Sequence, residues 1–242
     1  MPTRLWSVVF DASDHVALAR FWSSVLEWRF EESDGYSTVR SDDERVPRLE
    51  FVPAPTPKAA KNRIHIDICR ASTAEQIETV ERVRALGAVP VNIGQSADAH
   101  WTVLADPEGN EFCVSGTPDY GETVTGAIAG ISFDAARPSV LGRFWQAASG
   151  WDIVLEDDWG GVGLRAADGS GPFVAIWPSA DRKVGKNRLH FDVAPHPQDD
   201  QGAEVERLIA LGARHVDIGQ GDVDWVVLAD PEDNEFCVLT PR

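Results

Sequence analysis

The chain has 242 residues and contains the same sequence pattern twice. The stretch KNRIHID begins at Lys61 and returns as KNRLHFD at Lys186, and WTVLADPEGNEFCV at Trp101 returns as WVVLADPEDNEFCV at Trp225. A repeat of this extent indicates one duplicated domain of about 115 to 120 residues, an ordinary domain size. The copies predict a first domain over residues 1–117, a polar linker over 118–125 and a second domain over 126–242.

Each copy is predicted to contain two smaller modules of the same kind. In the first copy, alternating apolar residues predict strands and a spacing of three to four residues predicts helices. The first module is expected as a strand over 5–11, a helix over 15–28 and strands over 28–32, 36–40 and 48–52. The second is expected as a strand over 63–69, a helix over 73–86 and strands over 89–95, 100–106 and 111–116. Trp22 and Trp145 lie on the apolar helix faces and are expected in the core.

Composition excludes some classes of partner. The formal net charge of −17 and the lack of a basic cluster argue against binding to nucleic acid. No apolar run approaches the ~20 residues that span a bilayer, so no membrane partner is expected and the protein is predicted to be cytoplasmic. The odd set Cys69, Cys113 and Cys237 shows no Cys-x-x-Cys spacing, which favours reduced, buried thiols over disulfides.

Strand alternation predicts a polar face on the strand that holds the repeated histidine. One face of this strand is apolar, and the other carries Arg63, His65 and Asp67 in the first copy and Arg188, His190 and Asp192 in the second. Because such side chains cannot be buried dry and unpaired, this face should line a polar cup or meet solvent. We expect these six residues, with Trp101 and Trp225 on nearby strands, to bind a ligand.

Three interpretations of the two histidines stay open at this point. Each can line the cup while hydrogen-bonded to the aspartate two residues later, can bind a metal ion, or can act as an acid or base. The sequences DPEGN and DPEDN are interpreted as structural turns between two strands. Cys113 and Cys237 are interpreted as small packed thiols.

The module order, with a DP-x-(G/D)-N turn before the last strand, resembles the vicinal oxygen chelate superfamily. This superfamily includes glyoxalase I, fosfomycin resistance proteins, extradiol dioxygenases and bleomycin-binding resistance proteins. The motifs ADPEGNEFCV and RIHID look most like its glyoxalase-like branch. The resemblance implies an α+β fold of four βαβββ modules in tandem, each pair forming a curled mixed sheet with helices outside and a cup inside.

The resemblance also implies four positions for metal ligands in each cup. In the first copy they fall on Ser7, Glu50, His65 and Cys113, with Glu111 in reserve, and in the second on Gly130, Ala175, His190 and Cys237. Ser7, Gly130 and Ala175 are poor ligands or none. Only the first copy therefore offers three good donors, Glu50, His65 and Cys113, a mixed set that suits a divalent transition metal.

The sequence leaves two main hypotheses for function. The first is a protein of the bleomycin-resistance type that binds a small molecule in its cup without the full metal site and with no cofactor. The alternative is a metal-dependent lyase or dioxygenase with one Zn, Ni, Mn or Fe ion in the first domain. A purely structural module is a third class, which the polar cup disfavours. The duplicated chain is expected to act as a self-sufficient monomer resembling a dimer, or as a homodimer.

Overall fold

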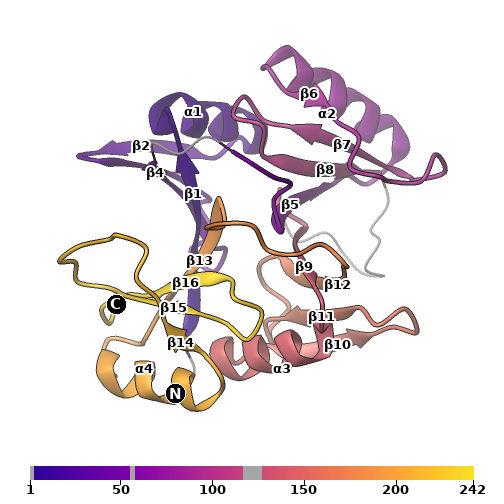
Figure 1. Ribbon diagram of the computed structural model, residues 1–242. Helices are drawn as coiled ribbons and strands as arrows, with labels where there is room; N and C mark the ends of the chain where they lie inside the picture. Colours follow the sequence, from indigo (N-terminus) through magenta and orange to yellow (C-terminus); the bar gives the residue numbers. More distant parts are fainter. Residues whose placement is uncertain (1–2, 55–57, 117–126) are drawn as a thin grey trace.

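The computed structural model describes residues 3–54, 58–116 and 127–242 (Figure 1). The expected linker over 118–125 lies outside these residues. Each copy contributes two modules, and each module runs strand, helix and three further strands, as the sequence predicts. No helix in the described part of the chain is long and apolar enough to cross a membrane.

The first copy contains modules 1 and 2. Module 1 consists of β1 (Arg4–Ala12), α1 (His15–Leu26), β2 (Arg29–Ser33), β3 (Tyr36–Arg40) and β4 (Arg48–Pro53). Module 2 consists of β5 (Ile64–Cys69), α2 (Thr73–Ala85), β6 (Val89–Pro90), β7 (Trp101–Ala105) and β8 (Glu111–Ser115). The strand expected over 89–95 is limited to β6, because Gly94 takes a φ of +93° and its N–H bonds the side chain of Asn92 in a turn.

The second copy repeats this order as modules 3 and 4. Module 3 consists of β9 (Gly130–Ala135), α3 (Pro138–Ser149), β10 (Asp152–Glu156), β11 (Val162–Arg165) and β12 (Phe173–Pro178). Module 4 consists of β13 (Leu189–Ala194), α4 (Gln201–Ala210), β14 (Arg214–His215), β15 (Val226–Ala229) and β16 (Glu235–Val238).

Two modules form each sheet, but the partners come from different copies. Sheet A is an eight-stranded mixed sheet with the order β14-β15-β16-β13-β1-β4-β3-β2, which joins modules 1 and 4. Sheet B has the order β10-β11-β12-β9-β5-β8-β7-β6, which joins modules 2 and 3. The antiparallel pairs β1–β13 and β5–β9 make the two junctions. Since β5 and β13 share one pattern, the sequence could not distinguish which of them pairs with β1.

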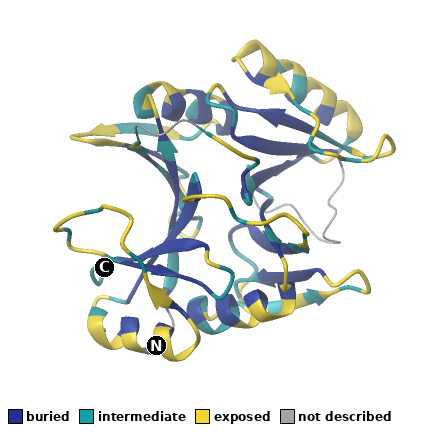
Figure 2. Cartoon of the chain, viewed as in Figure 1, coloured by how far each residue is buried: buried dark blue, intermediate teal, exposed yellow. Residues whose placement is uncertain are grey.

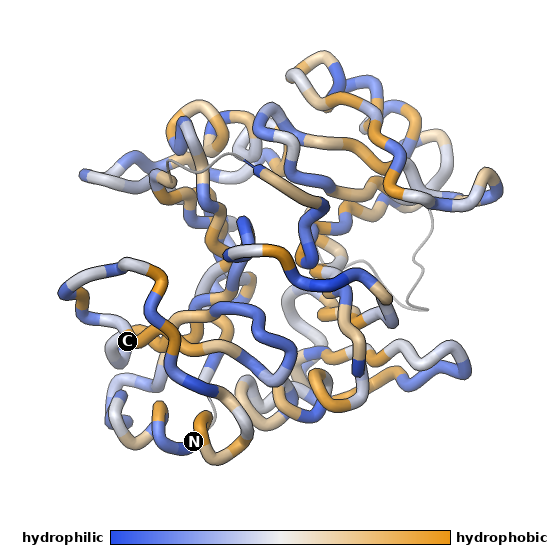
Figure 3. The backbone as a smooth tube through the Cα atoms, viewed as in Figure 1, coloured by the Kyte–Doolittle hydropathy of each residue, from blue (hydrophilic) through white to orange (hydrophobic). Residues whose placement is uncertain are grey.

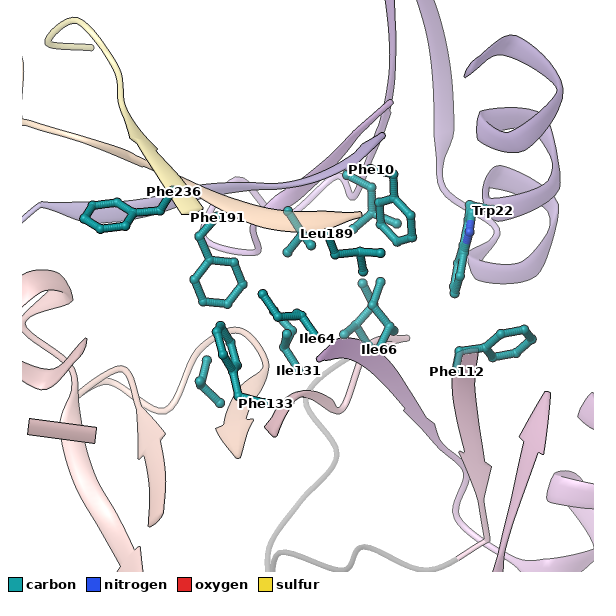
Figure 4. Packing of buried hydrophobic residues seen from close by; sticks show 14 of the residues in the cluster. Phe10, Trp22, Ile64, Ile66, Phe112, Ile131, Phe133, Leu189, Phe191 and Phe236 are labelled. Atoms are coloured by element: carbon teal, nitrogen blue, oxygen red, sulfur yellow. The ribbon is translucent and has the colours of Figure 1, made fainter. Parts of the chain in front are cut away.

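The two sheets pack back to back through their apolar faces. Ile64, Ile66 and Phe133 of sheet B face Leu189 and Phe191 of sheet A in one continuous buried cluster (Figure 4). The buried sides of the four helices join this cluster, whereas their outer sides are exposed (Figure 2). The hydropathy pattern agrees, with apolar stretches along the central strands and polar residues over loops and outer helix faces (Figure 3). Burial of this shared surface supplies the main free energy that holds the halves together.

The two tryptophans expected in the core are buried and also donate hydrogen bonds. Trp22 Nε1 of α1 donates to Asp106 Oδ2 at 3.1 Å, and Trp145 Nε1 of α3 donates to Asp230 Oδ2 at 3.2 Å. Asp106 and Asp230 begin the DPEGN and DPEDN turns, where each also accepts hydrogen bonds from the asparagine four residues later. The turns therefore anchor a helix as well as connecting two strands.

The glutamate of each turn connects the two sheets through hydrogen bonds and an ion pair. Glu108, in module 2, accepts the backbone N–H groups of Ser13 and Asp14 at 2.8 Å and pairs with Arg188 at 2.6 Å. Ser13 and Asp14 precede α1, and Arg188 precedes β13, so all three belong to modules 1 and 4, whose strands form sheet A. Glu232 occupies the matching place: it accepts the backbone N–H of Ala136 and the side-chain Nε–H of Arg137, and it pairs with Arg63. A turn glutamate thus connects the two sheets twice, once from each copy.

A truncated first half should not fold as a monomer. In residues 1–117 alone, β1 lacks β13 and β5 lacks β9, so both strands would present open edges and the apolar faces between the sheets. Because β5 matches β13 in pattern, two fragments can pair β1 of one with β5 of the other. We expect a folded homodimer by analytical ultracentrifugation and circular dichroism. A folded monomer would contradict the importance of the exchanged pairing.

Candidate functional site

The face of each sheet turned away from the core is lined by residues from both copies. Both sheets curl so that these faces open in opposite directions, and the helices pack on the other side (Figure 1). Cup A, on sheet A, is lined by Ser7, Val9, Arg48, Glu50, His190, Asp192 and Cys237. Cup B, on sheet B, is lined at the matching positions by Gly130, Ser132, Phe173, Ala175, His65, Asp67 and Cys113.

The structure does not bring together the predicted metal ligands Glu50, His65 and Cys113. Glu50 lies in sheet A, whereas His65 and Cys113 lie in sheet B. In the strand register, Val9 stands between Glu50 on one side and His190 on the other. The expectation followed ligand positions along one copy, but each cup combines one module of the first copy with one of the second. Glu50 therefore belongs with His190 and Cys237.

Each cup holds a compact group of three potential donor residues. His65, Asp67 and Cys113 form one group, and His190, Asp192 and Cys237 form the other. In each group, one nitrogen, one carboxylate oxygen and the sulfur lie within 4.8 Å of one another. Asp67 and Asp192 thus join the predicted histidine and cysteine positions. All three cysteines are buried thiols outside disulfides, as expected.

The group in cup B has hydrogen bonds of its own. Ser132 Oγ donates to Asp67 Oδ2 at 2.6 Å, and His65 Nε2 lies 3.4 Å from Asp67 Oδ1. Burial disfavours the charged form of His65, but the charge and hydrogen bond of Asp67 outweigh it, so the pKa of His65 is raised. This geometry agrees with the interpretation of a cup-lining histidine held by the aspartate two residues later.

The group in cup A leaves two buried polar atoms without partners. His190 Nε2 lies 3.7 Å from Asp192 Oδ1, which is too long for a hydrogen bond, and Ser7 Oγ approaches Asp192 Oδ2 only at 3.3 Å. Neither His190 Nδ1 nor Asp192 Oδ1 has a hydrogen-bond partner among the described residues. Both side chains are buried, with 7% of each residue exposed. Such unpaired groups are costly unless water, a ligand or an ion completes them.

The electrostatics of cup A follow from burial and from crowded acids. Burial, followed by the nearby charge of Glu50, raises the pKa of Asp192 to about 7. Burial also raises the pKa of Glu50, although Arg48 and Arg242 oppose that change. Burial lowers the pKa of His190 well below its usual range and raises the pKa of Cys237 well above its usual range. Near neutral pH, His190 is therefore a neutral imidazole and Cys237 a thiol.

Several predicted ligand-binding residues have other partners in the structure. Arg63 donates to the carbonyl of Asp134 and pairs with Glu232, and Arg188 pairs with Glu108, so both arginines join the contacts between the sheets. Glu111, the reserve ligand, pairs with Lys58 at 2.6 Å and also accepts the backbone N–H of Asn62. These side chains connect structural elements.

The two predicted strand tryptophans lie in different surroundings. Trp101 borders a groove of about 500 Å³ that is also lined by residues of α2. Trp225 directly precedes β15 and is 41% exposed. Neither makes a ring contact with a cup histidine in the described part of the chain.

Sequence reasoning missed the aromatic residue that cup A does contain. A β-bulge between Leu5 and Ser7 turns Trp6 to the same side as Ser7, where it packs against Ala194, Cys237 and Leu239. Simple alternation would have placed Trp6 on the face opposite Ser7. Three arginines, Arg4, Arg48 and Arg242, surround its ring. Their distant positions in the sequence gave no signal that they meet.

Fold and site together define an α+β protein of the glyoxalase-like class, with a His–Asp–Cys group on the outer face of each of its two sheets. The family model described as glyoxalase-like domain matches residues 7–115 and again residues 130–239. The chain belongs to this family, which confirms the resemblance to the vicinal oxygen chelate superfamily.

Solved structures show the same fold at low sequence identity. Glyoxalase I from Zea mays superposes with a TM-score of 0.65 at 12% identity, covering 98% of this chain and 92% of that one. A putative dioxygenase from Bacillus subtilis superposes with a TM-score of 0.66 at 12% identity, covering 99% of this chain and 86% of that one. At this identity the comparison shows the fold alone. No curated protein matches the chain.

The raised pKa of Asp192 predicts that its replacement stabilises the protein at high pH. The folded-state pKa of about 7 exceeds the ordinary 3.8, so the contribution of Asp192 to stability is greatest below pH 3.8 and is lost as the pH rises towards 7. Relative to wild type, the Asp192→Asn variant should therefore gain about 2.5 kcal/mol in free energy of unfolding between pH 5 and pH 8.

Urea unfolding of metal-free protein at both pH values measures this difference. Asp67→Asn is the matched change in cup B, where it weakens the hydrogen bond from Ser132. A constant difference between Asp192→Asn and wild type at the two pH values would show that Asp192 ionises normally.

Proposed function

We propose that this glyoxalase-like protein binds a small organic molecule in cup A. The observation that carries the proposal is the pair of unpartnered buried atoms, His190 Nδ1 and Asp192 Oδ1. Buried polar atoms in folded proteins nearly always have partners, so two neighbouring buried atoms without any are suited to polar groups from a ligand. Trp6 and Val9 supply apolar contact beside them.

Cup B is less suited to the same ligand. Its histidine and aspartate already contact each other and Ser132. Ala175 stands at the position of Glu50, and Phe173 at that of Arg48. The ring of Phe173 lies so close over Gly163 that a Cβ on this glycine would be 1.9 Å from it. Phe173 thus fills space that a polar ligand would need.

Ligand-observed NMR with a panel of small metabolites tests the proposal. We expect binding to wild type, with the dissociation constant of a bound compound raised about fivefold or more in His190→Ala, since one hydrogen bond is lost. His65→Ala removes the matching side chain of cup B and should leave that constant unchanged. Compounds that depend on His65 but not on His190 would place the ligand in cup B instead.

A metal-dependent lyase or dioxygenase is the second candidate, because the donor group of cup A suits a transition metal. His190, Asp192 and Cys237 supply nitrogen, oxygen and sulfur, and Glu50 stands next to them in the same cup. This mixed set fits a single Zn, Ni, Mn or Fe ion. A bound metal would supply Lewis acidity to oxygens of the ligand. The positive charge of the ion would offset the repulsion between the carboxylates of Glu50 and Asp192.

Metal content distinguishes the two candidates. Untagged protein incubated with Zn²⁺, Ni²⁺, Mn²⁺ or Fe²⁺ and then desalted is analysed by mass spectrometry of the metals. For a metal enzyme we expect one equivalent that disappears in His190→Ala and persists in His65→Ala. Binding should strengthen from pH 6 to pH 8, because Cys237 and Asp192 must lose protons. Metal retained by His190→Ala would exclude cup A as the metal site.

A single chain contains all the residues that the two proposals assign to cup A. Both sheets, and therefore both cups, are complete within a single chain. This supports a monomer as the working unit, with a small molecule as its partner. The division of the sequence at 118–125 stays a prediction, since the sheets cross it.

A further inference from the structure

We propose that the ligand of cup A is a small organic anion and that Arg48 binds its carboxylate, phosphate or sulfonate group. The inference rests on the proposed function, because it assumes that cup A is the binding site. It adds the chemical class of the ligand and the residue that recognises it. The observations that support it are the positions, the partners and the net charge of three guanidinium groups around Trp6.

The three arginines converge on one indole ring. The guanidinium carbon of Arg48 lies 4.2 Å from the ring centroid of Trp6, that of Arg4 lies at 5.0 Å and that of Arg242 at 5.5 Å. The residues come from β4, from β1 and from the segment after β16, so the fold itself brings them together. Contact with a ring face lets a guanidinium remain partly dehydrated.

Among the three arginines, Arg48 is the one whose guanidinium N–H groups are available to a ligand. It makes no hydrogen bond and no ion pair with another residue in the described ranges, although it lies in the electrostatic range of Glu50. By contrast, Arg4 donates to the carbonyl of Arg242, and Arg242 donates to Thr240. An open guanidinium fork matches the two oxygens of a carboxylate or phosphate.

Charge favours an anion at this corner. Three guanidinium groups around one ring repel each other. Glu50 lies within electrostatic range of both Arg48 and Arg242, and Asp192 lies within that of Arg242. The chain as a whole carries a net charge of −17 and repels anions. A local cationic cluster inside such a surface acts as a selective feature, because an anion gains attraction at this corner.

The strand register sets the size and polarity of the ligand. Arg48 stands opposite Ser7, and Ser7 stands opposite Asp192, so Arg48 and Asp192 are two strands apart. Neighbouring strands lie about 4.8 Å apart, which separates the two backbone positions by about 10 Å. This span suits a molecule with an anionic head at Arg48, an apolar body over Ser7 and Trp6, and a polar group at Asp192 and His190.

Two aromatic probes that differ in one anionic group test the inference. The first is 1-anilinonaphthalene-8-sulfonate, and the second is N-phenyl-1-naphthylamine, which has the same rings without the sulfonate. Fluorescence titration gives a dissociation constant for each with the full chain. We expect wild type to bind the sulfonate at least tenfold more tightly, and Arg48→Gln to weaken its binding at least tenfold while leaving the neutral probe unchanged.

Two further variants separate charge from structure. Arg48→Lys keeps the charge and should recover most of the sulfonate binding that Arg48→Gln loses. Arg20→Gln is the matched control, because the Arg20 guanidinium lies 4.4 Å from the ring centroid of Phe30 in a similar contact elsewhere on the protein. Its binding of both probes should equal that of wild type. Circular dichroism and thermal unfolding confirm that each variant is folded.

The outcomes distinguish this inference from the function on which it rests. If His190→Ala weakens both probes and Arg48→Gln weakens neither, cup A binds ligands but the anion inference is overturned. If neither variant changes either probe, the probes bind elsewhere and both proposals are contradicted. Equal affinity of wild type for the two probes, or no binding of the sulfonate, would also overturn the inference.

Discussion

The antiparallel pairing of β1 with β13, and of β5 with β9, is the constraint on which the rest of the structure depends. It joins modules from opposite copies into each sheet, and it places the apolar faces of both sheets against each other. The turn glutamates Glu108 and Glu232 then connect one sheet to the other. Because of this pairing, each cup takes its histidine from one copy and the position of Glu50 or Ala175 from the other.

The sequence predicted local features well because they depend on local patterns. The repeat, the four modules, the buried helix tryptophans and the turns at Asp106 and Asp230 were all readable from spacing. Pairing between modules was not readable, because β5 and β13 present nearly the same pattern to β1. This ambiguity placed Glu50 with His65, whereas the structure places it with His190. The β-bulge at Trp6 was not predicted either, since one extra residue in a strand reverses the face that a side chain occupies.

Differences between the two cups are confined to one side of each. The His–Asp–Cys group is the same in both, and it comes from modules 2 and 4. The side supplied by modules 1 and 3 has changed, with Arg48 and Glu50 in cup A and Phe173 and Ala175 in cup B. Cup A therefore carries Arg48, Glu50 and buried polar atoms without partners, whereas cup B carries Phe173 and a hydrogen-bonded Asp67. This asymmetry supports assigning different roles to two sites of common origin.

The exchange of modules has a consequence for how such a chain can change. In a protein whose duplicated halves each formed their own site, a substitution in one half would alter one complete site. Here each cup has a constant half and a variable half, encoded about one domain apart in the chain. If cup A binds a ligand as proposed, replacing only Arg48 and Glu50 on β4 would change its ligand preference, while Leu49 and Phe51 of the same strand, the histidine half and cup B stayed as they are. In such an architecture the side of a cup that differs between the copies can change independently of the side that carries the His–Asp–Cys group.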